Sequence, residues 1–144
     1  MSKYPKEFPE KFEEEILPKG AAHKRKTVYR IIKSGKIDRE GFISTYEEVK
    51  RGLIPEPKRG LNLNDPGTYS TSCNMVYEEA EYWLDVFMRH HPKALIAKGI
   101  TEPSCGPSQL TSEREARDDT HVDWWIYEEA QPQIFFEEVD DCDA

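Results

Sequence analysis

The segment from Val76 to Met88 has the clearest periodicity in this 144-residue chain. Apolar side chains recur there at spacings of three and four residues, and acidic residues occupy the other faces. The apolar set is Val76, Ala80, Trp83, Leu84, Phe87 and Met88. This spacing predicts an amphipathic helix that packs one face on a core. Asn74 is the expected N-cap, and Pro92 ends the helical segment.

Short β-rich segments lie on both sides of this helix. They are Thr27–Ile32, Tyr69–Ser72, Ala94–Ala97, Val122–Tyr127 and Gln133–Val139. The last two are separated by the turn-forming segment Glu128–Pro132, which predicts a hairpin. Because helices come early and paired strands come late, the order favours an α+β class over a doubly wound parallel sheet. We expect a mainly antiparallel mixed sheet with helices packed on it.

Two shorter helices are expected before the long one. Phe8–Leu17 has apolar residues at helical spacing, and Thr45 with Glu48 has the spacing of a capping box. No Gly/Ser-rich linker divides the chain, so residues 1–144 are expected to form one domain. Within it, residues 1–26 are predicted to be a helical extension, and residues 140–144 an acidic tail that frays.

The overall composition excludes several classes of protein. The net charge of −8 opposes general binding to nucleic-acid phosphates. No apolar run is long enough to span a membrane, and the N-terminal residues lack the apolar stretch of a secretory signal. A cytoplasmic location is therefore expected. The three widely spaced cysteines, Cys73, Cys105 and Cys142, predict neither a disulfide framework nor a metal site.

Arg30 is the first candidate for a functional residue. It lies within a predicted strand whose two faces are both largely apolar, so the strand is expected to be central. A buried, unpaired guanidinium is too costly to persist. Arg30 therefore either forms an ion pair with a carboxylate or binds an anionic ligand such as a phosphate.

Two later segments carry the remaining candidates. In Tyr69–Cys73, alternation places Ser70 and Ser72 on one side, where hydroxyls can orient a ligand or cap the next helix. In the segment from residue 121 to 127, one face holds Val122, Trp124 and Ile126 and is expected to be core. The other face comprises His121, Asp123, Trp125 and Tyr127. This second face is either a pocket wall that stacks an aromatic ligand or an amphipathic strand covered by a loop.

The order of these features resembles the mono-ADP-ribosyltransferase fold of the arginine–serine–glutamate type. The resemblance rests on Arg30, on Ser70-Thr71-Ser72, and on the helix that follows them. The third element departs from the family pattern. Glu113 and Glu115 have a Glu-x-Glu spacing but lie before the Trp124–Trp125 segment, and Asp123 lies on that segment but is an aspartate.

The resemblance implies a site for NAD and no metal. NAD would bind in a cleft between Arg30, Ser70 and the His121–Tyr127 strand, with Arg30 on the pyrophosphate. Ser70, with Ser72 beside it, would position the nicotinamide ribose or the catalytic acid, and Trp125 or Tyr127 would stack on nicotinamide. The catalytic acid would be Glu115, Glu113 or Asp123, which would stabilise an oxocarbenium-like transition state. The implied partners are a small-molecule nucleotide and a protein acceptor.

A non-catalytic alternative also fits the sequence. In that case the aromatic face at His121–Tyr127 and the acidic surface would bind a protein partner. A ligand-binding enzyme requires Arg30 and that face to converge on one cleft, whereas an interaction module requires only an exposed aromatic patch. The two hypotheses therefore predict different positions for the same residues.

Overall fold

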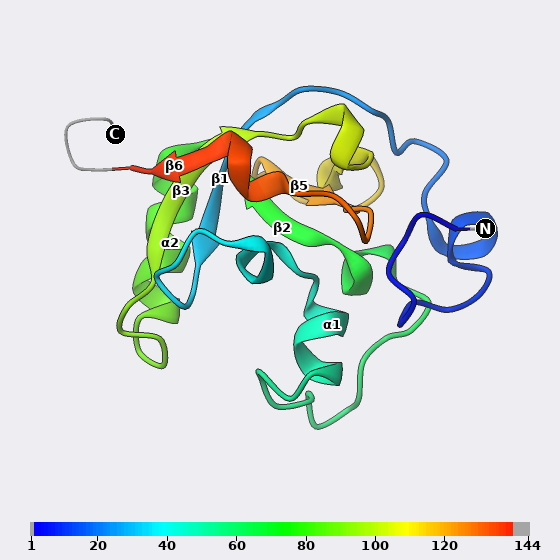
Figure 1. Cartoon of the computed structure of the whole chain (residues 1–144), viewed down its shortest axis with the longest axis horizontal. Helices are drawn as coiled ribbons and strands as arrows, with labels where there is room; N and C mark the ends of the chain where they lie inside the picture. Colours follow the sequence, from blue (N-terminus) through cyan, green and yellow to red (C-terminus); the bar gives the residue numbers. More distant parts are fainter. Residues whose placement is uncertain (1, 140–144) are drawn as a thin grey trace.

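A computed structural model describes residues 2–139 of the chain. Its centre is a six-stranded sheet with the order β4-β5-β2-β1-β3-β6, in which every pairing is antiparallel (Figure 1). The strands are β1 (Thr27–Ile32), β2 (Thr71–Asn74), β3 (Leu95–Ile100), β4 (Ser108–Leu110), β5 (His121–Trp124) and β6 (Phe136–Glu138). Together with the helices this arrangement confirms the predicted α+β fold class.

The helical elements are short apart from one. They are a π-helical turn at Phe12–Ile16, α1 (Thr45–Lys50), α2 (Tyr77–Phe87), and 3-10 turns at Arg39–Phe42, Pro66–Tyr69, Pro103–Cys105, Thr111–Glu113 and Pro132–Phe135. No helix within residues 2–139 is long and apolar enough to cross a membrane.

Helix α2 confirms the predicted long helix but buries less of it than expected. Ala80 is buried against Ile31 of β1 and Ile96 of β3. Trp83 and Met88 remain 40% and 43% exposed. Helix α2 packs on β1, β2 and β3, and Trp83 and Met88 lie largely outside this contact. Its N-cap is also not Asn74, which belongs to β2.

The sequence analysis predicted the N-cap of α1 one residue too late, at Thr45. Ser44, not Thr45, is the N-cap, and it forms the capping box with Glu47. The Ser44 hydroxyl accepts a bond from the Glu47 backbone N–H at 3.2 Å, and Glu47 Oε1 accepts one from the Ser44 backbone N–H at 3.0 Å. Both residues are buried, so these bonds replace water at the start of the helix.

Ser44→Ala is therefore expected to lower the free energy of unfolding by about 1 kcal/mol, because it removes the cap. Thr45→Ala is the matched control, since Thr45 has no capping role, and should change stability by less than about 0.5 kcal/mol. Urea denaturation of both variants measures the difference. Equal losses would contradict the assignment of the cap to Ser44.

The predicted hairpin between the last two strands is wrong. Strand β5 pairs with β2 and β4, whereas β6 pairs with β3 at the opposite edge of the sheet. Phe136 packs on Phe42 and Trp124 in the core, and these contacts stabilise β6 in its position beside β3. Gly99 admits this pairing, because a Cβ at that position would overlap the Phe135 carbonyl oxygen and the Phe136 ring. Strand β4 was missed because its residues lack the β-branched and aromatic types that mark strands.

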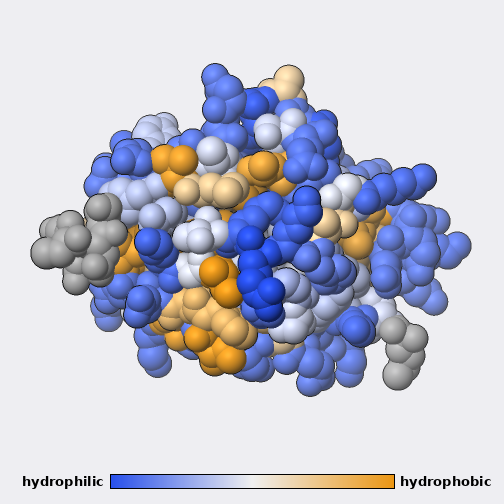
Figure 2. Space-filling view, turned by 90° about the horizontal axis from the view of Figure 1, so that it is seen from above, coloured by the Kyte–Doolittle hydropathy of each residue, from blue (hydrophilic) through white to orange (hydrophobic). Residues whose placement is uncertain are grey.

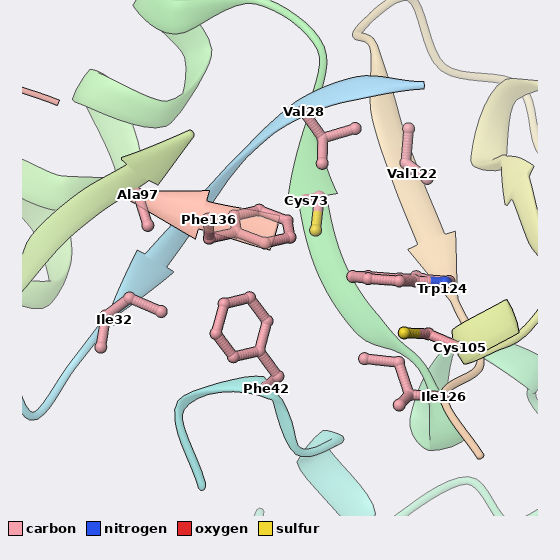
Figure 3. Close-up of a cluster of buried hydrophobic side chains, with 10 residues drawn as sticks. All are labelled: Val28, Ile32, Phe42, Cys73, Ala97, Cys105, Val122, Trp124, Ile126 and Phe136. Carbon is pink, nitrogen blue, oxygen red and sulfur yellow. The ribbon is translucent and has the colours of Figure 1, made fainter. Parts of the chain in front are cut away.

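One face of the sheet carries the main apolar core. Figure 3 shows its ten buried side chains gathered between the strands and Phe42. They are Val28, Ile32, Phe42, Cys73, Ala97, Cys105, Val122, Trp124, Ile126 and Phe136. The central position predicted for Thr27–Ile32 is confirmed, since β1 lies between β2 and β3.

The N-terminal segment is part of the core rather than a helical extension. Tyr4, Phe8 and Phe12 are buried in a second cluster that also contains Tyr69 and Trp125. Only five residues of the predicted helix are helical, in the π-helical turn. The segment therefore contributes to the domain itself, at the end of the sheet distant from α2 (Figure 1). The predicted acidic tail, 140–144, lies outside the described residues.

Candidate functional site

The site begins where two central strands separate. Strand β1 pairs with β3 along all six of its residues but has a single register pair with β2, Tyr29 with Asn74. Figure 3 shows β1 and β2 diverging below Val28 and Cys73. Backbone groups that would otherwise pair across β1 and β2 therefore need other partners.

Arg30 bonds to one carbonyl of β2 and to two carbonyls of the segment before α1. Its Nε donates to the Gly41 carbonyl at 3.1 Å, Nη1 to the Ser72 carbonyl at 3.0 Å, and Nη2 to the Ile43 carbonyl at 3.5 Å. Arg30 is 9% exposed and forms no ion pair with a carboxylate of residues 2–139. A guanidinium has five N–H groups, so one on each Nη remains without a protein acceptor among the described residues. The sequence left two possibilities for Arg30, an ion pair or an anionic ligand. In the structure Arg30 instead donates to three backbone carbonyls, and two of its N–H groups have no acceptor among the described residues.

A pocket of about 260 Å³ lies beside Arg30, between β1, β2, α1 and α2. Four of the six predicted cofactor-binding residues line it: Arg30, Ser70, Ser72 and His121. Ser72, Asn74 and His121 share the sheet face next to α2, whereas Arg30 lies on the other face of β1 with Val28 and Ile32.

Several lining residues were missed by the sequence analysis. They are Glu48, Trp83, Phe87 and Arg117. Trp83 and Phe87 had been assigned to the buried face of the helix, and Glu48 to a capping box. The sequence pattern could not identify these residues. Helical periodicity shows that Trp83 and Phe87 lie on the apolar face of α2, but it does not show which part of that face lines a pocket.

The expected aromatic wall is not part of this pocket. Trp125 is fully buried, and its Nε1 donates to the Pro66 carbonyl at 2.9 Å. Strand β5 ends at Trp124, so the alternation that grouped Trp125 with His121 does not continue. The Tyr127 hydroxyl lies 2.7 Å from His23 Nε2, and its ring packs on Tyr4 in the N-terminal segment. Neither Trp125 nor Tyr127 lines the pocket.

Asp123 is buried behind the pocket rather than exposed within it. Its Oδ1 accepts a hydrogen bond from Ser70 Oγ at 2.5 Å, and its Oδ2 accepts one from Thr111 Oγ1 at 2.7 Å. Arg114 Nη2 lies 2.8 Å from the same Oδ2. Since Asp123 is 1% exposed and fully engaged, it orients the two hydroxyls and does not contact a ligand directly.

Glu113 and Glu115 lie on the exposed segment after β4. Glu115 is 3.9 Å from Arg117 in a solvent-exposed ion pair, and neither glutamate lines the pocket. Among the described residues that line it, the carboxylate is Glu48, whose Oε2 is 3.1 Å from Lys33 Nζ. The structure thus brings none of the three predicted catalytic acids into the pocket itself.

The described cysteines do not supply a nucleophile. Burial raises the pKa of the Cys73 thiol to about 12, and burial also raises the pKa of Cys105. Both remain in the neutral thiol form at neutral pH. Within residues 2–139 no three His, Cys, Asp or Glu side chains are grouped as metal ligands. Cys142 lies outside the described residues.

Comparison with known proteins assigns no family to this chain. No protein-family model matches it, and no curated protein and no solved structure matches it either. Its function is therefore inferred from the site alone.

Proposed function

We propose that the chain is an ADP-ribosyltransferase-like domain that binds NAD in the pocket between β1, β2, α1 and α2. The observation that carries this proposal is convergence. Arg30, Ser70, Ser72 and His121 come from segments far apart in the sequence, yet all line one pocket. Such convergence is what a ligand site requires and what an exposed interaction patch does not.

The charges of the pocket favour an anionic ligand. The whole chain carries a net charge of −8, and hydrophilic residues dominate the face in Figure 2. The pocket lining nevertheless contains Arg30, Lys33 and Arg117 against the single carboxylate of Glu48. Lys33 pairs with Glu48 and Arg117 with Asp119, so Arg30 is the lining cation that has no carboxylate partner among residues 2–139. Such a cation attracts phosphate groups. Arg30 has two N–H groups without an acceptor among residues 2–139, and a guanidinium commonly binds two phosphate oxygens through two such groups.

The pocket also has aromatic rings for a base. Trp83 and Phe87 line it, with ring centroids 6.1 Å apart. Trp83 is 40% exposed, so a bound nicotinamide or adenine ring can stack on it without moving the core. Trp83 therefore takes the role that the sequence analysis gave to Trp125 or Tyr127.

A transfer reaction would also need a carboxylate near the ribose. We assign this role to Glu48, the carboxylate among the described residues that line the pocket, in place of Glu115, Glu113 or Asp123. A carboxylate there stabilises positive charge that develops on the ribose as the bond to nicotinamide breaks. In the unliganded protein this carboxylate is paired with Lys33.

A protein-interaction module remains the second candidate, and α2 favours it. Tyr82 is 62% exposed and contacts the Trp83 ring, and Met88 at the end of the helix is 43% exposed. This apolar surface replaces the aromatic face at His121–Tyr127 that the sequence suggested. If α2 only binds a protein, replacing Tyr82 and Trp83 will weaken that binding alike, and NAD will not bind.

The two candidates are separated by calorimetric titration with NAD. Wild-type protein is expected to bind, and Trp83→Ala to bind about tenfold more weakly, because a stacked ring contributes roughly 1–3 kcal/mol. The matched control is Tyr82→Ala, an exposed aromatic neighbour that does not line the pocket and should leave the NAD affinity unchanged.

Fluorescence provides an independent measurement. Trp124 and Trp125 are fully buried, so the emission that a pocket ligand quenches comes from Trp83. Absence of both heat and quenching at millimolar NAD would overturn the proposed function. Equal affinities for the Trp83→Ala and wild-type proteins would place the NAD site elsewhere.

A further inference from the structure

A chain of hydrogen bonds connects His121 to the buried Asp123. His121 Nδ1 lies 2.6 Å from Thr111 Oγ1, and Thr111 Oγ1 lies 2.7 Å from Asp123 Oδ2. Thr111 and Asp123 are each 1% exposed, so no bulk water competes for these bonds. Ser70 bonds to the other oxygen of Asp123 at 2.5 Å.

The direction of each bond follows from the number of hydrogens. The Thr111 hydroxyl has one hydrogen and two close neighbours. The Asp123 carboxylate, paired with Arg114 at 2.8 Å, only accepts, so it takes that hydrogen. His121 Nδ1 must therefore carry its own hydrogen and donate it to Thr111. In the neutral ring this leaves the Nε2 lone pair bare.

The environment keeps the ring neutral at neutral pH. Burial lowers the pKa of His121 below its ordinary value near 6.5. The cationic side chains of Arg117 and Arg114 act in the same direction, whereas Asp123 and Asp119 oppose it. Arg30, Lys33 and Glu48 are the other charged groups that line the pocket.

Nε2 is the ring nitrogen that remains for the pocket. His121 lines the pocket, and its Nε2 has no hydrogen-bond partner among residues 2–139. Ser70 and Ser72 line the same pocket, and Ser70 shares the Asp123 carboxylate with Thr111. The Asp123 carboxylate thus binds the Ser70 hydroxyl directly and the His121 ring through Thr111.

We propose that His121 accepts a hydrogen bond or a proton from the pocket's ligand through Nε2, and that Thr111 and Asp123 are the positioning residues that fix its tautomer. The ligand class is one that presents an O–H group at this point, such as a ribose hydroxyl. The ligand's identity as NAD rests on the proposed function, whereas the tautomer of the free protein does not.

Long-range ¹H–¹⁵N correlation spectra of the histidine rings test the arrangement in the ligand-free protein. Wild-type His121 is expected to be protonated at Nδ1 and bare at Nε2 at neutral pH. Thr111→Val should abolish this preference, and Thr111→Ser should retain it because the hydroxyl remains. His23, His90 and His91 act as controls in the same spectra, since they should not change tautomer with residue 111.

Protonation of wild-type His121 at Nε2 would overturn the inference, as would an unchanged tautomer in folded Thr111→Val. If Thr111→Val does not fold, the wild-type and Thr111→Ser spectra decide. Saturating NAD is then expected to shift the His121 Nε2 resonance. NAD binding without that shift would overturn the acceptor role. A free-protein spectrum as expected, with no heat on NAD addition, would support the tautomer and contradict only the proposed function.

Discussion

Trp125→Ala is expected to lower the free energy of unfolding by about 3–5 kcal/mol, the usual cost of deleting a fully buried large ring. Trp125 is 0% exposed and belongs to the cluster that holds Tyr4, Phe8 and Phe12 against the sheet. The substitution leaves a cavity there and removes the donor to the Pro66 carbonyl. The N-terminal segment should therefore loosen together with the loss of stability.

The matched control is Trp83→Ala, which removes the same side chain from an exposed position. It should change stability by less than about 1 kcal/mol while it weakens NAD binding. Urea denaturation measures the stabilities, and limited proteolysis measures access to the N-terminal segment. A small loss of stability in Trp125→Ala would contradict the assignment of Trp125 to the core. An equally large loss in Trp83→Ala would contradict the assignment of Trp83 to the pocket surface.

Asp123→Ala is expected to cost about 3–5 kcal/mol of stability, because it leaves a partly buried guanidinium without its partner. Arg114 is 18% exposed and lies 2.8 Å from the Asp123 carboxylate. Ser70 and Thr111 lose their acceptor in the same variant. The loss should be visible in urea denaturation at neutral pH.

Asp119→Ala is the control for Asp123, since Asp119 also pairs with an arginine but at the surface. Its bond to Arg117 is 2.7 Å long, with both side chains about one-third exposed. Exposed ion pairs contribute only about 0–1 kcal/mol. Similar losses for the two aspartates would show that the buried network has no special weight, and Asp123 would again be a candidate for direct contact with a ligand.

Parts of the fold and site could be predicted because they depend on near neighbours in the chain. The helical period identified α2, and the β-branched residues identified β1. Alternation grouped Ser70 with Ser72, and the family resemblance placed Arg30, Ser70 and the His121–Tyr127 strand around one cleft. Arg30, Ser70, Ser72 and His121 were therefore found together in the pocket, although their role there is still a proposal.

Other parts depend on contacts between distant segments and could not be predicted. The sequence pattern of residues 133–139 does not show whether β6 pairs with β3 or with β5. The pairing with β3 depends on the packing of Phe136 against Phe42 and on the space left by Gly99. Asp123 could be seen in the sequence, but its burial by Thr111 and Arg114 could not.

The segment at Val76–Met88 illustrates the division most simply. The sequence by itself determined that these residues form a helix with one apolar face, since that property depends only on spacing along the chain. The tertiary structure decided that Ala80 is buried while Trp83 lines a pocket, because that depends on how the helix lies over strands β1 and β2 where they separate. The tertiary structure also decided the burial of two later tryptophans. Trp124 is buried in the cluster that contains Phe136 of β6, and Trp125 is buried in the cluster that contains the N-terminal aromatic residues.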